Sequence, residues 1–131
     1  MTFLKHYLIA LVVFTAIDLV WLLFISRKLY QAKIGHLMAE KVVWPAAALF
    51  YLLYIAAIVF FAVNPAADRG SVLYALGAGA FLGLVAYGTY DLTNLATLRA
   101  WPVSVTAIDL AWGAFVTGAT SALTTWIGGK L

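Results

Sequence analysis

Apolar residues fill four long stretches of this 131-residue chain, and polar residues gather between them. Each stretch approaches or exceeds the roughly 20 residues that an α-helix needs to cross a bilayer. We predict helices over about residues 4–26, 44–63, 72–98 and 102–127, with a polar connector over 27–43. Lipid cannot hydrogen-bond an open backbone, so helices are the expected structure for such stretches. The pattern therefore predicts an all-α membrane protein, a four-transmembrane-helix bundle that forms a single domain.

Turn-forming residues and proline mark the ends of these helices. The segment from Asn64 to Gly70 predicts a turn, because it is rich in residues that stop helices. Pro45 and Pro102 fit first helical turns, where a missing N–H is harmless. Trp44 and Trp101 beside them fit the headgroup region of the bilayer.

The connector has two open interpretations. Its apolar residues share helical spacing, which favours a short interfacial helix, but an ordinary ordered loop is an equal alternative because Gly35 weakens the helix. The residues with this spacing are Tyr30, Ile34, Leu37, Met38 and Lys41.

Lysine and arginine favour one orientation. The first and third connections carry five of these residues, and the opposite side carries Lys5, Arg69 and Lys130. The positive-inside rule then predicts cytoplasmic connectors and periplasmic termini, with dual topology left open by the modest bias.

Composition narrows the function classes. The chain is 66% hydrophobic, and its net charge of +3 is scattered over segment ends, which suits contact with membrane lipids and offers no basic face for nucleic acid. It has no cysteine, which excludes disulfides, thiolate nucleophiles and cysteine-based metal sites.

Three aspartates interrupt the apolar stretches. A charged side chain in the bilayer costs about 2.5–3.5 kcal/mol on insertion scales, so three of them need a reason. Asp18, Asp91 and Asp109 each lie seven or eight residues from the cytoplasmic end of a predicted helix. At about 1.5 Å per residue, all three are predicted at one depth, roughly 10–12 Å inside the boundary.

Two of the aspartates lie in nearly identical surroundings. The seven residues that end at Trp21 and the seven that end at Trp112 match at six positions, and each Trp follows its Asp by three residues. The helices run in opposite directions, so this is an inverted local repeat. In the third helix, Tyr87, Asp91 and Asn94 lie one turn apart on one face.

Glycines predict where the third helix packs. Gly79 and Gly83 lie in line with Asp91, and small residues let membrane helices approach closely. We therefore expect Asp91 to face a neighbouring helix rather than lipid, with Gly113 serving the fourth helix similarly. A homodimer through this face, or a membrane-protein partner, stays open.

These residues predict an intramembrane acidic and aromatic site. Close carboxyls cannot all ionise in a low-dielectric site, so they can exchange protons for a cation, and aromatic rings can face a cationic or amphipathic, lipid-like ligand. Binding or translocation, possibly coupled to protons, is the first hypothesis. The candidate residues are Asp18, Asp91, Asp109, Asn94, Tyr87, Trp21, Trp112, Tyr90 and Thr93.

Three alternatives stay open. The acids could divide acid and base roles in a lipid-modifying enzyme, or hold Mg²⁺ with Asn94, although no nucleophile–base pair or metal-spacing motif is present. The chain could be an accessory subunit of a lipid-metabolism complex. The acids could also simply join helices by hydrogen bonds. No cofactor can be named, and His6 and His36 are predicted to be interfacial.

The other polar and aromatic residues are predicted to be scaffold. The second helix has no embedded charge, and its aromatic residues are expected to pack or face lipid. Hydroxyls in the second half of the fourth helix are expected to bond back to the helix, or to line a wet path to Asp109; these are Thr117, Thr120, Ser121, Thr124 and Thr125.

Several of these motifs together resemble a known family. They are the twelve residues from Tyr87 to Leu98, Trp101-Pro102, the five residues from Asp109 to Gly113, Asp18 with Trp21-Leu22, Gly35-His36-Leu37 and the five residues from Phe50 to Tyr54. The pattern resembles small bacterial membrane proteins grouped as a domain of unknown function, DUF2177. The resemblance covers nearly the whole chain and implies a bacterial inner-membrane protein of four helices. It implies no activity, substrate or catalytic residue.

Overall fold

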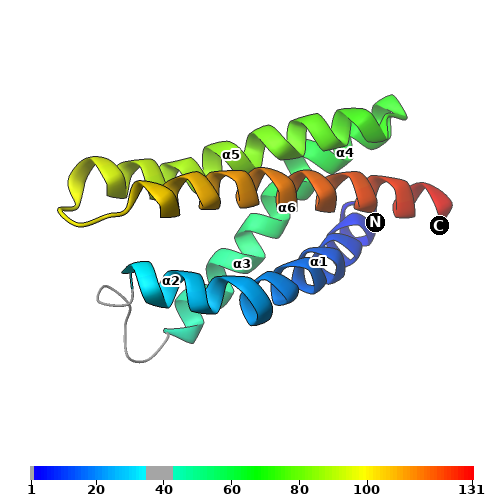
Figure 1. The fold of residues 1–131 in the computed structure, drawn as a ribbon. Helices are drawn as coiled ribbons and strands as arrows, with labels where there is room; N and C mark the ends of the chain where they lie inside the picture. The colour runs from blue at the N-terminus through cyan, green and yellow to red at the C-terminus, as the bar shows by residue number, and fades with distance from the viewer. Residues whose placement is uncertain (1, 35–42) are drawn as a thin grey trace.

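The computed structural model describes residues 2–34 and 43–131, and helices make up almost all of these two ranges. Four of its helical stretches are long and apolar enough to cross a membrane: Thr2–Phe24, Trp44–Arg69, Val72–Thr97 and Val103–Lys130. Both termini lie at the same end of the molecule (Figure 1). The predicted all-α fold with four spanning helices is confirmed.

The first span runs on beyond its predicted end. Helix α1 (Thr2–Trp21) passes through a π-helical turn (Leu22–Ser26) into α2 (Arg27–Ile34). The sequence from Thr2 to Ile34 contains no glycine or proline, so no residue forces the helix to stop at the polar boundary. The first half of the connector is therefore helical. Residues 35–42, with Leu37, Met38 and Lys41, lie outside the described residues.

The second span also extends further than predicted. Helix α3 (Trp44–Ile58) continues through a π-helical turn (Val59–Val63) into α4 (Asn64–Arg69). The turn predicted from Asn64 is wrong, because the helix continues through Pro65. A proline inside a helix lacks the N–H for the i→i−4 bond, and the wider π-helical turn just before it accommodates this loss.

Glycine ends this span in a recognisable way. Gly70 has φ of 63°, a left-handed conformation that glycine adopts without steric penalty. Its N–H donates to the Ala67 carbonyl at 3.1 Å, and the Ser71 N–H donates to the Ala66 carbonyl at 3.0 Å. This pair of bonds is the Schellman motif. Ser71 then caps α5 (Val72–Thr97), because its hydroxyl accepts from the Tyr74 N–H at 3.0 Å.

Helices α5 and α6 (Val103–Lys130) form the central antiparallel pair and lie side by side along their length (Figure 1). Glycines allow this approach. A Cβ at Gly83 would overlap the Gly113 carbonyl, and one at Gly79 would lie 2.7 Å from the Thr117 carbonyl oxygen. The prediction that these glycines pack against a neighbouring helix is confirmed.

A second layer crosses this pair. Helix α1 and the π-helical turn Val59–Val63 pack against α6, and α3 runs diagonally behind it (Figure 1). Their shared core is apolar and draws on α1, the second span and α6; it contains Ala10, Phe14, Tyr54, Ile55, Ile58, Val59, Val63 and Val116. The first two spans thus hold this face of α6 in place.

Trp101 is buried in the protein. It is only 6% exposed, packs with Ile34 and Val105, and donates its indole N–H to the Thr106 hydroxyl at 3.0 Å. A protein hydroxyl therefore satisfies its indole. Trp44 is exposed at the start of α3, and the headgroup position of both residues stays a prediction.

We expect Gly83→Ala to destabilise the chain by about 1–3 kcal/mol, the usual range for overpacking a tight core. The added methyl group must push α5 away from the Gly113 carbonyl. Unfolding in mixed detergent micelles measures the change. Gly77→Ala is the matched control, because a Cβ there meets nothing within 4 Å. Equal losses in both variants would contradict the close-packing argument.

Candidate functional site

Asp91 and Asp109 line one cavity. Its volume is about 630 Å³, which is typical of ligand pockets. Helices α3, α5 and α6 supply its walls, and the lining residues are Phe50, Ala86, Tyr87, Thr89, Tyr90, Asp91 and Asp109. Two acids that are 18 positions apart in sequence are therefore brought to one aromatic-lined space. We call it the acid cavity.

Asp91 is the most unusual residue of the acid cavity. Its exposed fraction is 0%, and neither carboxyl oxygen has a hydrogen-bond partner among the described residues. Buried carboxyls in proteins normally have partners, and an orphaned one points to an unmet ligand, proton or water. The backbone around Asp91 is better satisfied, since its carbonyl accepts from the Thr106 hydroxyl at 3.4 Å.

Asp109 faces the acid cavity from the other helix. It is 9% exposed and lies one turn before Gly113, where α6 comes closest to α5. The prediction that Asp91 faces a neighbouring helix is confirmed, because that face of α5 packs on α6. An ionised carboxyl inside such a largely apolar space is costly, and a proton or a cation at the carboxyl lowers that cost.

Asp18 lies apart from this pair. It is half-buried on α1, within interaction range of the Trp112 indole, and it does not line the acid cavity. The Trp112 N–H itself lacks a partner of full hydrogen-bond geometry in the described chain. Among residues 2–34 and 43–131, no three acidic or histidine side chains come together as a metal site. The three aspartates therefore do not form one trio.

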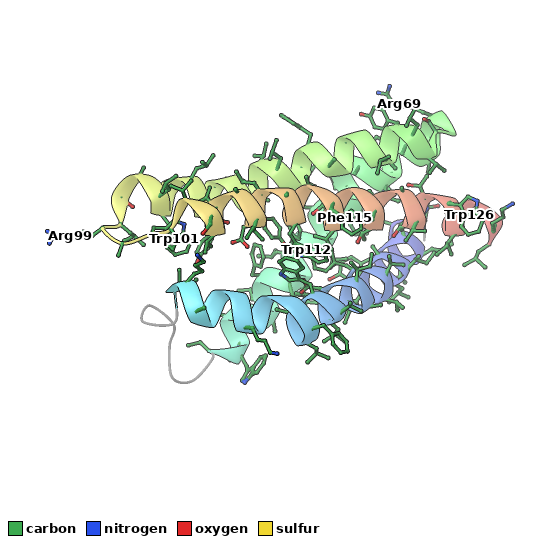
Figure 2. All side chains as sticks on the ribbon, viewed as in Figure 1. Arg69, Arg99, Trp101, Trp112, Phe115 and Trp126 are labelled. Carbon is green, nitrogen blue, oxygen red and sulfur yellow. The ribbon has the colours of Figure 1, made fainter. Side chains whose placement is uncertain are left out.

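The two repeated segments do meet, through their tryptophans. Trp21 and Trp112 stack with ring centroids 4.3 Å apart and an interplanar angle of 10°. Trp112 packs at the centre of α6 on the side that faces α1 (Figure 2). The inverted repeat is thus an actual contact between α1 and α6, with Asp18 beside it and Asp109 one turn away along α6.

Tyr87 lies between the two acidic regions. It interacts electrostatically with both Asp18 and Asp91, and its ring packs directly on Gly113. Its ring also contacts Tyr54, with centroids 6.2 Å apart. The Tyr54 hydroxyl in turn bonds the Thr117 hydroxyl at 2.7 Å. Tyr87 and Tyr54 therefore lie between the acid cavity and the polar face of α6, joined to each other by a ring contact.

The remaining candidates divide between cavity and surface. Tyr90 lines the acid cavity, is 56% exposed and lies within interaction range of the Asn94 side chain. Asn94 is partly buried beside it. Thr93 is exposed and does not line the cavity.

The hydroxyls of α6 follow the predicted back-bonding in part. Ser121 donates to the Thr117 carbonyl at 2.7 Å, and Thr125 donates to the Ser121 carbonyl at 2.8 Å. Thr120 and Thr124 are fully buried, and their hydroxyls have no partner among the described residues. Back-bonding thus accounts for two of the five residues.

Sequence reasoning missed two features. Phe50 lines the acid cavity, although its helix carries no charge that would have signalled a role. His6 is buried, and its Nδ1 lies 2.6 Å from the Asn64 side-chain oxygen, a contact that the sequence did not indicate. The extension of the helix through Pro65 is what places Asn64 within reach of His6.

The family profile described as "Predicted membrane protein (DUF2177)" matches residues 3–126. The chain belongs to this family, as the motifs around Tyr87 and Asp109 indicated. No curated protein and no solved structure matches the chain.

We expect Asp91→Asn to keep or raise the free energy of unfolding of the ligand-free chain. An orphaned carboxyl contributes no hydrogen bond, and a neutral amide of the same shape is less costly to bury. Chemical unfolding in micelles tests this, with Tyr54→Phe as the comparison. That variant breaks the bond to Thr117 and should lose about 0.5–1.5 kcal/mol. A loss above that range for Asp91→Asn would show that the acid joins helices.

Proposed function

We propose that this member of the DUF2177 family binds a lipophilic or amphipathic cation in the acid cavity and exchanges it for a proton. The observation that carries the proposal is the Asp91 carboxyl, which is fully buried and has no hydrogen-bond partner within residues 2–34 and 43–131. A membrane helix tolerates such a group when it serves an ion, a proton or a ligand. Asp109 supplies a second acceptor across the same space.

The walls of the acid cavity suit an apolar cation. Phe50, Tyr87 and Tyr90 offer three aromatic rings, and aromatic faces attract cations most strongly where water is excluded. A strongly hydrated metal ion would gain little from these rings. An ammonium or phosphonium centre with apolar groups matches both the rings and the carboxyls.

The rim of the cavity indicates the direction of access. Phe50, Thr89 and Tyr90 are all exposed on the outside of the bundle, within the spanning helices. The surface there faces lipid in a membrane, so a ligand dissolved in the bilayer reaches the acids from the side. An amphipathic ligand fits this route better than a water-soluble one.

Proton exchange follows from the pair of acids. A cation is held best when a carboxyl is ionised, and protonation of that carboxyl releases it. Binding should therefore strengthen as pH rises and should release protons into the buffer.

Tetraphenylphosphonium is a suitable probe. We expect Asp91→Asn and Asp109→Asn each to weaken its binding about tenfold or more, as is usual for a hydrogen-bonded or charged contact. Calorimetry in micelles at several pH values, in buffers of different ionisation enthalpy, measures affinity and proton release together. Asp68→Asn is the matched acid control, because Asp68 is exposed and does not line the cavity.

A second pair of variants tests the aromatic wall. Phe50→Ala should weaken the probe severalfold, whereas Phe61→Ala should not. Both residues are exposed phenylalanines of the same span, and only Phe50 lines the cavity. Equal affinity in the wild type and Asp91→Asn, with no dependence on pH, would overturn the proposal.

We further propose a bacterial inner-membrane location with periplasmic termini. The four spans return the chain to its starting side, and the larger share of lysine and arginine lies in the other connections.

The absence of cysteine allows a direct test of orientation. Asp68→Cys should react with an impermeant thiol reagent added to intact spheroplasts, and Arg99→Cys should react only after the membrane is opened. These exposed residues lie at opposite ends of the bundle. Labelling of both variants in intact spheroplasts would show dual topology.

A further inference from the structure

A second cavity lies at the end of the bundle that holds both termini. Its volume is about 440 Å³, and α1, α4, α5 and α6 contribute to it. The lining residues are Thr2, Lys5, His6, Ala67, Gly70, Val72, Thr125, Trp126, Gly128, Gly129 and Lys130. It lies far from Asp91 along the helices, and none of the described residues that line it is acidic. We call it the basic cavity.

Cationic groups from both ends of the chain meet in the basic cavity. Lys5 comes from the first turns of α1, and Lys130 ends α6. The Lys5 ammonium donates to the Gly128 carbonyl at 3.0 Å, and the Lys130 ammonium lies 5.8 Å from the centre of the Trp126 ring. One carbonyl and one ring leave most of the donor capacity of the two ammonium groups available, because each carries three N–H bonds.

His6 lines this cavity with a ring of fixed orientation. Its Nδ1 is held at 2.6 Å by the Asn64 side-chain oxygen, which fixes the orientation of a ring that is only 3% exposed. The other edge of the ring packs against Gly128, where an added Cβ would lie 3.0 Å from Nε2. The ring and the Lys5 ammonium therefore converge on the same turn of α6.

The start of α5 contributes a further positive feature. Gly70 and Val72 line the cavity, so the first turn of a 26-residue helix opens onto it. The amide groups of a first helical turn carry partial positive charge and commonly bind phosphate. Ser71 already occupies the Tyr74 N–H, which leaves the earlier amides for a ligand.

We propose that the basic cavity binds a phosphate group. Two ammonium groups and a helix start border a space whose described lining residues include no acidic side chain, and a phosphate oxyanion can accept hydrogen bonds from such donors. The position at a membrane boundary suits the headgroup of an anionic lipid, and free phosphate has the same chemistry. The capping of α6 by Lys5 explains one contact only and does not explain why Lys130 borders the same space.

The test uses the whole chain in a phosphate-free maltoside detergent at fixed pH. Native mass spectrometry compares dioctanoyl phosphatidic acid with dioctanoyl glycerol, which has the same chains and no phosphate. We expect the phosphatidic acid to bind at least about tenfold more tightly. Competition by inorganic phosphate would show that the phosphate group alone suffices, and its failure to compete would assign the site to lipid headgroups.

Variants locate the binding. Lys130→Gln and Lys5→Gln should each weaken phosphatidic acid binding about tenfold. Lys130 contacts only a ring on the surface, so its replacement should not disturb folding. Arg69→Gln is the matched control, since its guanidinium lies over the Tyr74 ring at the same end of the molecule and does not line the cavity (Figure 2).

Two results would overturn the proposal. One is equal affinity for dioctanoyl glycerol and phosphatidic acid. The other is an equal loss in Arg69→Gln and Lys130→Gln, which would show attraction to general surface charge. Asp91→Asn should leave phosphatidic acid binding unchanged, so this test is independent of the acid cavity.

Discussion

The close approach of α5 and α6 is the constraint on which the rest of the structure depends. Helices in lipid gain little from burying apolar side chains, because the surrounding chains are equally apolar, so their association relies on contact at short range. Gly79, Gly83 and Gly113 provide that contact by removing side chains from the interface. The same approach encloses Asp91, which lies about two turns beyond Gly83 on α5, and turns it away from lipid.

The α5–α6 pair is tightly packed at one end and borders the acid cavity at the other. Towards the termini, the interface is filled by glycines and by hydroxyls that bond to their own helix, such as Ser121. Towards the other end, the helices hold an acid each around an open space. The close packing near the termini fixes how α5 and α6 are placed relative to each other. Asp91 and Asp109 can therefore line one cavity at the other end of the pair.

Much of the fold could be predicted from the sequence, and less of the site. Hydrophobic length gave the four spans, and the spacing of Gly79 and Gly83 gave the packed face. Counting residues from helix ends placed Asp18 at the level of Asp91, but depth says nothing about rotation around the bundle. Because α1 packs on α6 and α3, Asp18 lies beside Trp112 instead of in the cavity. Pro65 led to the prediction of a turn where the helix continues, because the π-helical turn that accommodates this proline has no clear sequence signature.

That π-helical turn has a consequence for how the chain tolerates insertion and deletion. A π turn is one residue longer than an α turn, and each residue of an α-helix advances the chain by about 100° around the axis. The π-helical turn between Val59 and Val63 holds one more residue in about the same rotation, so loss of one residue there would restore a regular helix and leave the direction of α4 nearly unchanged. Loss of one residue from the regular part of α3 would instead rotate everything beyond it by about 100° and turn Asn64 away from His6. The π-helical turn is therefore the place in this span where the chain best tolerates a one-residue deletion.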